Sequence, residues 1–195
     1  GWSGAFAGIF TALASMFFIL ALGYTTVANA LFMSGIAPFI TAILARYFLA
    51  EHIPAITWVG AVLSACGLAI MVGGGLQLGQ IMGTVLAFGS AVSFSLFCFM
   101  LRRGRQNDML PSLIHSGLFS IVVATVLLLA LDSPAAFVLT PHDLVLCIAL
   151  GVIQLGLGTV LFTLGARDVP AARMQVLATM ELVLSPFWAF LVVGE

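Results

Sequence analysis

The sequence is poor in charge and contains no lysine. Only 7% of its 195 residues are charged, whereas a soluble globular domain usually carries about 25% charged residues. A surface with so little charge is suited to lipid, whose interior is as apolar as a leucine side chain. The net charge of −1 provides no basic surface for nucleic acid. The lack of lysine also excludes the membrane receptors that hold retinal through a lysine Schiff base.

Patterns typical of enzymes and metal sites are absent as well. The three cysteines, Cys66, Cys98 and Cys147, lie within apolar stretches and form no CxxC or Cys/His pattern. We interpret them as small buried hydrophobic residues. The sequence has no HExxH, GxSxG or P-loop motif. We therefore expect no enzymatic activity, no metal and no cofactor.

Long apolar stretches make up most of the chain. Hydrophobic residues account for 63% of the sequence, and the mean hydropathy is +1.25. Because a membrane-spanning helix needs about 20 mostly apolar residues, the pattern predicts seven spans. They cover residues 3–22, 27–49, 53–73, 80–101, 111–131, 144–166 and 172–193. The expected fold is an all-α, polytopic transmembrane helical bundle.

All basic residues fall on one side of this seven-helix arrangement. The six arginines follow the second, fourth and sixth spans or lie at their ends, and the loops on the other side carry Asp132 and Asp143 but no basic residue. The arginines are Arg46, Arg102, Arg103, Arg105, Arg167 and Arg173. By the positive-inside rule, the arginine-bearing loops are expected to be cytoplasmic.

The chain carries a weak internal repeat. When it is shifted by 144 residues, the segment 26–29 aligns with 170–173 and Glu51 aligns with Glu195. Both copies begin at a short turn and remain apolar for about 20 residues, the length of one membrane span. An offset of five helices reverses the direction of the second copy. Inverted repeats of this kind are typical of secondary transporters, which bind substrate near the middle of the membrane.

The sequence resembles the EamA-like transporters of the drug/metabolite transporter superfamily. The resemblance rests on two segments, each a turn followed by an apolar helix and a glutamate. The first is Ala21–Ala30 with Ala37-Pro38 and Glu51, and the second is Val169–Arg173 with Glu181, Ser185–Trp188 and Gly194-Glu195. In that family each half of the protein has five helices, with such a turn before the fourth helix and Gly-Glu after it.

The resemblance implies a division of the chain into two parts. Residues 1–73 correspond to helices three to five of the first five-helix repeat, and residues 80–195 correspond to the first four helices of the second, inverted repeat. The chain is therefore expected to be a fragment that lacks helices one, two and ten. Two departures, Leu182 in place of proline after Glu181 and Ala50 in place of glycine before Glu51, leave open which branch of the family it resembles.

Three candidate pathway residues belong to the repeated segments. Glu181 is expected near the middle of the seventh span, where a charge is costly unless it faces a cavity or a partner. It is a candidate for proton uptake or substrate contact, and the alternative is a protonated carboxyl that bonds a neighbouring helix. Arg173 could attract anionic groups or serve as an interfacial anchor. Asn29, its counterpart in the repeat, could line a cavity or cap a turn.

Three further candidates are polar or aromatic residues, one each in the fifth, sixth and seventh predicted spans. His115 is expected near the cytoplasmic face, where its ring could titrate or join helices. Gln154, in the sixth span, could contact substrate or bond another helix. Trp188 could belong to a cavity wall or to the lipid-facing surface. Pro38 and Pro186 are expected to kink their helices, either to line a binding cavity or for purely structural reasons.

The resemblance implies a secondary transporter of the bacterial inner membrane. It would export or exchange small metabolites, such as amino acids or amphipathic organic compounds, by alternating access. Its expected partners are the small-molecule substrate, the lipid bilayer and a second copy in a homodimer, with no nucleic acid. A seven-helix receptor or another non-transporting membrane protein is the alternative, and an intramembrane enzyme is disfavoured because no catalytic constellation is present.

Overall fold

The computed structural model describes residues 2–60, 62, 63, 66, 78–130, 140–178 and 180, and these form helices joined by turns, with no strand among them. Residues 55–60 are helical, and the other helices have the following bounds: α1 Trp2–Leu22, α2 Val27–Ser34, α3 Ala37–Phe48, α5 Leu78–Arg103, α6 Pro111–Ala130, α7 Pro141–Ala149, the π-helix η2 Leu150–Leu157, α8 Gly158–Gly165 and α9 Ala171–Ala178. The expected all-α class is confirmed.

Within the described residues, four helical stretches are long and apolar enough to cross a membrane. They are Trp2–Leu22, Asn29–Phe48, Ile81–Arg103 and Pro141–Gly165, and a shorter apolar helix covers Pro111–Val126. The expected membrane bundle is therefore confirmed. The expected spans 53–73 and 172–193 lie partly outside the described residues.

The second expected span is divided into α2 and α3 by a turn at Gly35 and Ile36. Pro38 has no N–H and cannot continue the α-helical hydrogen bonding toward Ser34. The turn is instead closed by shorter-range bonds, from the Gly35 N–H to Phe32 O at 3.0 Å and from the Ile36 N–H to Met33 O at 3.2 Å. The break therefore lies just before the proline, and Pro38 occupies the first turn of α3, where proline is well tolerated.

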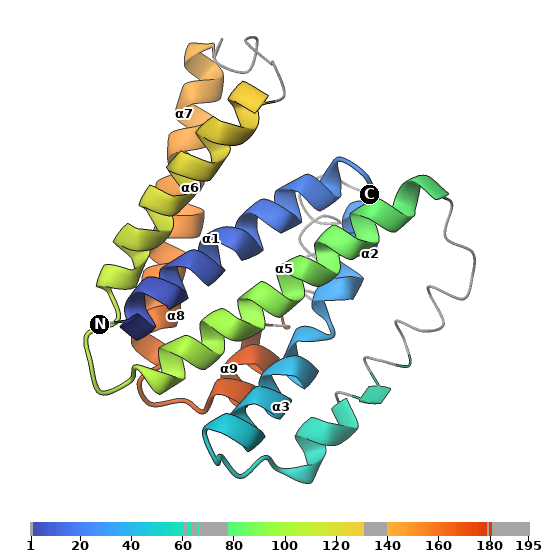
Figure 1. Cartoon of the computed structure of the whole chain (residues 1–195), viewed down its shortest axis with the longest axis vertical. Helices are drawn as coiled ribbons and strands as arrows, with labels where there is room; N and C mark the ends of the chain where they lie inside the picture. Colours follow the sequence, from blue (N-terminus) through green and yellow to red (C-terminus); the bar gives the residue numbers. More distant parts are fainter. Residues whose placement is uncertain are drawn as a thin grey trace.

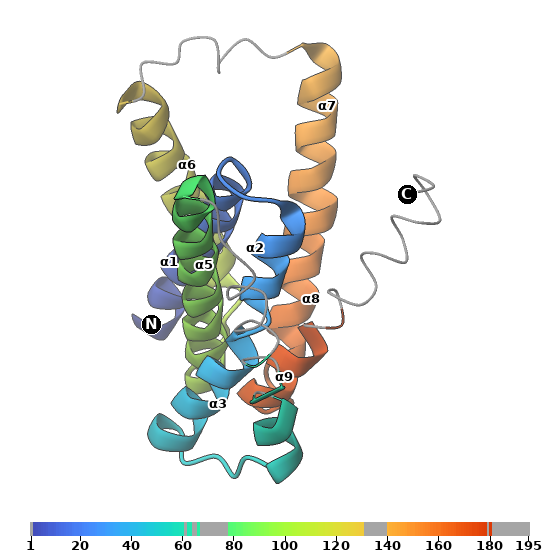
Figure 2. The ribbon, with the colours of Figure 1, turned by 90° about the vertical axis from the view of Figure 1, so that its right-hand side faces the viewer.

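The sixth expected span is one long helix with a widened centre. It starts at Pro141, where Thr140 and Asp143 form a capping box that bonds the first free N–H groups. Its central eight residues form η2, and α8 continues to Gly165. Stretches of π-helix are rare and often occur at functional sites. In Figure 2 this long helix stands beside the rest of the bundle, and α7 and η2 contain no buried residue.

The core of the bundle is the packing of α5 against α1, α2 and α3, while α6 covers the other side of α1 (Figure 1). Small residues allow the close approach. A Cβ atom at Gly8 would lie 2.5 Å from the Ser112 carbonyl oxygen of α6, and the Ser90 hydroxyl of α5 donates to Ala14 O of α1 at 2.8 Å. Backbones that meet this closely gain van der Waals contact, which drives helix association in lipid.

The helix ends that carry arginine gather at one end of the bundle. Helix α3 ends there with Arg46 and α5 with Arg102 and Arg103, while α8 ends and α9 begins at the same level (Figure 2). We call this the arginine end. Its opposite contains the turn between α1 and α2 and the start of α5 (Figure 1).

Candidate functional site

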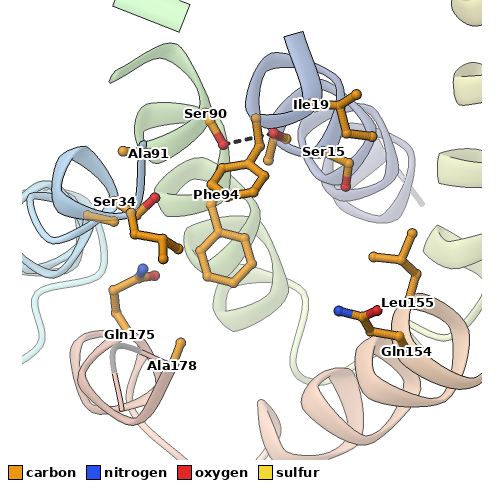
Figure 3. A pocket seen from close by; sticks show the side chains of 14 residues that line it. Ser15, Ile19, Ser34, Ser90, Ala91, Phe94, Gln154, Leu155, Gln175 and Ala178 are labelled. Carbon is orange, nitrogen blue, oxygen red and sulfur yellow. Dashed lines mark hydrogen bonds between the residues drawn. The ribbon is translucent and has the colours of Figure 1, made fainter. Parts of the chain in front are cut away.

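A cavity of about 340 Å³ lies among α1, α2, α3, α5, η2 and α9. Apolar side chains form most of its wall, and the polar members are three serines and two glutamines (Figure 3). Its lining residues are Ala14, Ser15, Phe18, Ile19, Leu31, Ser34, Ala37, Ser90, Ala91, Phe94, Gln154, Leu155, Gln175 and Ala178. The volume falls at the lower end of the range typical of small-molecule sites.

The three serines of the wall use their hydroxyl protons on backbone carbonyls. Ser90 donates to Ala14 O at 2.8 Å, Ser34 donates to Ala30 O at 3.2 Å, and Ser15 donates to Thr11 O at 3.2 Å. Each hydroxyl proton is thereby occupied, so toward the cavity these oxygens are acceptors. Among the described lining residues, N–H donors on side chains come from the two glutamine amides alone.

Gln175 is held firmly in the first turns of α9. Its side chain is only 2% exposed, and its Oε1 accepts hydrogen bonds from Cys98 Sγ at 3.1 Å and from Thr41 Oγ1 at 3.4 Å. These partners belong to α5 and α3, so the amide joins three helices. Figure 3 shows the side chain extending from α9 toward Ser34 and Phe94.

Gln154 approaches the cavity from the opposite wall. It belongs to η2, and its amide points into the space between that helix and Phe94 (Figure 3). Unlike Gln175, it is largely exposed. The structure thus places this predicted site residue at the cavity, within the π-helical segment.

The other predicted site residues that the structure describes lie elsewhere. Arg173 is exposed on α9. His115 is exposed on α6, with its Nδ1 atom 2.8 Å from Pro111 O. Asn29 is buried near the other end of the bundle, where its Nδ2 donates to Thr25 Oγ1 at 2.6 Å and to Thr84 Oγ1 at 3.0 Å. None of the three lines the cavity.

Three predicted residues, Glu181, Pro186 and Trp188, lie outside the described residues. Pro38 is described, and it directly follows Ala37, which lines the cavity. The break before Pro38 therefore borders the cavity, as a broken helix of a transporter often does.

Between the cavity and the arginine end, α3 and α9 meet through a cluster of small side chains. Its buried members are Ala42, Ala45, Ile53, Ala171 and Ala172, with Leu49 and Trp58 packed against them. The four alanines are each at most 2% exposed. Alanine lets two helix backbones approach closely, so this contact separates the cavity from the arginine end.

Next to the alanine cluster, at the arginine end, the guanidinium of Arg102 joins the ends of α3, α5 and α8. Arg102 Nε, at the end of α5, lies 2.6 Å from Glu51 Oε1, which follows α3. Arg102 Nη1 donates to the carbonyl oxygen of Arg167, which follows α8, at 3.0 Å. The side chains of Arg102 and Glu51 are 11% and 16% exposed, so solvent screens this pair weakly. A second pair, Arg167 with Asp108, spans 3.2 Å and is exposed.

The position of Glu51 depends on the end of α3. Ala50 has φ 51°, and the Glu51 N–H bonds back to Ala45 O at 3.1 Å. Glycine normally occupies such a left-handed position directly after the C-terminus of a helix. The departure from Gly-Glu noted in the sequence therefore places an alanine in a backbone conformation that costs it energy.

Sequence reasoning missed Gln175 and its partners Thr41 and Cys98. Gln175 follows two residues after Arg173, near the start of a predicted span, where a polar side chain is common at the membrane interface. Helical spacing in the sequence could have indicated that Gln175 is buried. Gln175 is four residues after Ala171, so both lie on one helix face, and that face packs against α3.

Comparison with known proteins gives one match. No curated protein and no solved structure matches the chain. The first 73 residues, which include α1, α2 and α3, match the family model described as the EamA-like transporter family. The resemblance expected from the sequence is therefore confirmed for residues 1–73, which carry the pattern of EamA-like transporters.

Proposed function

We propose that the chain forms part of a secondary transporter that exports or exchanges small metabolites, such as amino acids or amphipathic organic compounds. The observation that carries this proposal is the cavity. Helices α1, α2 and α3 of the family-matching segment line one part of it, and α5, η2 and α9 line the rest. Transporters bind substrate between two such halves, near the middle of the membrane.

Alternating access requires, on each side of the cavity, a contact between helices that closes the cavity when it forms and opens it when it breaks. The contact of α3 with α9 and the Arg102 bridges are suited to this task at the arginine end. The alanine cluster buries little surface per residue, and one guanidinium joins the ends of α3, α5 and α8. We infer that opening toward the arginine end separates α3 from α9 and breaks the bond from Arg102 to Arg167 O.

The proposed inverted repeat gains support from two helix starts. Helix α2 begins at residue 27 and α9 at residue 171, a separation equal to the 144-residue shift found in the sequence. Helix α2 starts at the end opposite the arginine end, and α9 starts at the arginine end (Figure 2). The two copies thus start from opposite sides, as an inverted repeat requires.

The proposed setting is the bacterial inner membrane, with the arginine end in the cytoplasm. The basic helix ends support this orientation through the positive-inside rule. A proton or substrate gradient would drive transport, and Glu181 is the proposed protonation or substrate-contact group. A homodimer is a further proposal, because the apolar face of α7 and η2 is uncovered by the described residues.

Counterflow in proteoliposomes tests the proposed function. Full-length protein is reconstituted and offered a panel of labelled amino acids, with and without a pH gradient, as wild type and as Glu181→Gln. We expect at least one compound to move in the wild type and the pH dependence to disappear in the variant. Transport that is unchanged by Glu181→Gln would contradict the proposed role of that residue.

The same experiment addresses the alternative of a receptor or non-transporting membrane protein. Because this alternative has no step that moves a solute, well-folded protein would give no counterflow with any compound of a broad panel. Monodisperse behaviour in detergent before reconstitution is the control for folding. Absence of counterflow under these conditions would favour the receptor.

A further inference from the structure

Gln175 differs from the other described polar residues of the cavity wall because its side-chain oxygen is hydrogen-bonded to the protein and its side-chain nitrogen is not. Its Oε1 accepts from both Cys98 and Thr41. Its Nε2 has no hydrogen-bond partner among the described residues, and the residue lines the cavity. A primary amide has two N–H donors on that nitrogen. The side chain is therefore fixed through its oxygen, and its donors remain for a ligand.

The rest of the described wall cannot replace these donors. The serine hydroxyls give their protons to backbone carbonyls, and the remaining side chains except Gln154 are apolar. Gln154 is largely exposed and has no hydrogen bond within the described part of the chain. Its free rotation costs more conformational entropy on binding than a side chain that is already fixed. Gln175 is thus the preorganised donor of this wall.

The apolar part of the wall surrounds this donor. Phe94 of α5 and Phe18 of α1 both line the cavity, and Figure 3 shows Phe94 beside the Gln175 side chain. A ligand here gains free energy by burying an apolar group against these rings. Its polar group must accept a hydrogen bond, because a group that only donates leaves the Gln175 donors without a partner.

We propose that Gln175 is a specificity-determining residue of the cavity, which selects solutes that carry an acceptor oxygen, a carbonyl or a carboxylate, next to an apolar group. This inference rests on the proposed function for its biological meaning. It can nevertheless be tested by binding alone, so the two proposals can fail separately.

Two probes of equal charge differ by one carboxamide group, which supplies the acceptor oxygen. Phenylalaninamide and 2-phenylethylamine carry the same ring and one amine, and only phenylalaninamide has a carbonyl group. Their binding to full-length protein in detergent is measured at mildly acidic pH, where both amines are protonated. A neutral hydrogen bond contributes about 0.5–1.5 kcal/mol, so we expect phenylalaninamide to bind about two- to twelvefold more tightly to the wild type.

Substitution of Gln175 should abolish this preference. Gln175→Leu keeps the approximate size of the side chain and removes its donors, so both probes should bind with equal affinity. Leu177→Ile, at an exposed position on the same helix, is the matched control and should retain the preference. Thermal unfolding in detergent checks that both variants are folded.

The anchoring bonds provide a second test that does not change Gln175. The double variant Thr41→Val and Cys98→Ala removes both donors to Oε1, so the amide becomes free to rotate or to turn its oxygen toward the cavity. We expect the preference for phenylalaninamide to fall at least twofold, although Gln175 is present. If Gln175 has a purely structural role, Gln175→Leu and the double variant should instead each lose affinity for both probes equally.

Four outcomes decide the inference. A preference that disappears in Gln175→Leu and weakens in the double variant supports it, whether or not the protein transports any solute in proteoliposomes. A preference that survives Gln175→Leu overturns it, as does equal binding of the probes to wild type. Failure of both probes to bind the folded wild type also overturns it for ligands of this size and shape.

Discussion

The two ends of α5 contact the first part of the chain through different chemistry. At its start, Gly83 packs against Thr25 so closely that a Cβ atom would lie 2.5 Å from Thr25 Cβ, and Thr84 accepts from Asn29 at 3.0 Å. At its other end, Arg102 pairs with Glu51 at 2.6 Å. The first contact depends on shape and neutral hydrogen bonds, and the second depends on charge.

This difference bears on how each end can move. A close-packed neutral contact loses many small van der Waals terms together as soon as the helices separate. A charge pair near the membrane surface can be replaced by water, but it leaves a costly group behind if one partner is lost while the other remains buried. We therefore expect the Arg102 end to tolerate opening better than the Gly83 end, and to tolerate mutation of one partner worse.

The largest effect is expected for Arg102→Gln. The substitution leaves Glu51, only 16% exposed, without its cation, and removal of one partner from a buried pair typically costs about 3 kcal/mol or more. Arg103→Gln is the matched control, because Arg103 is the exposed neighbour. Thermal unfolding in detergent measures both variants. Equal losses of stability in the two would show that the Glu51 pair contributes nothing specific.

A smaller loss is expected for Gly83→Ala. The added methyl group has no room against Thr25, and overpacking of this kind typically costs about 1–3 kcal/mol. Gly117→Ala serves as the control, because a Cβ atom there has no atom within 4 Å. In the control, alanine should raise the stability of α6 slightly, since it favours helix more than glycine. A Gly83→Ala variant as stable as wild type would disprove the close contact.

The smallest effect is a gain in stability for Ala50→Gly. Ala50 has φ 51°, and relief of this conformation should stabilise the folded chain by about 0.5–1 kcal/mol after the greater freedom of unfolded glycine is deducted. The opposite sign is expected for Ala45→Gly, inside α3, where glycine weakens a helix by a similar amount. Urea or thermal unfolding of the pair measures the sign directly, and a loss in both would contradict this account.

Much of the fold was predictable because the membrane imposes a strong rule on sequence. A lipid-spanning helix must be long and apolar, so the spans beginning near Trp2, Leu78 and Pro111 could be located from hydropathy. The break at Gly35 and Ile36 was less accessible. A proline signals a disturbed helix, but whether the chain bends at the proline or breaks before it depends on the packing of the neighbouring helices.

The candidate site was harder to predict than the fold. Gln154 was identified because an isolated amide inside an apolar span needs an explanation. Gln175 gave no such signal beside Arg173, because polar residues are ordinary at a membrane interface. Its role depends on Thr41 and Cys98, which are 134 and 77 residues away in sequence, and only the packing of α3 and α5 brings these residues to it.

The π-helical segment has a consequence for how the cavity could diverge between related proteins. A π-helix accommodates an extra residue within a helix whose ends keep their positions. Loss of one residue from Leu150–Leu157 would restore α-helical winding while both flanks keep their orientation, so that the side chains within this segment alone change direction. Gln154 would leave the wall and a neighbouring side chain would replace it. A one-codon deletion could therefore exchange the chemistry of this wall without any substitution, and length variation here is the change to look for among relatives.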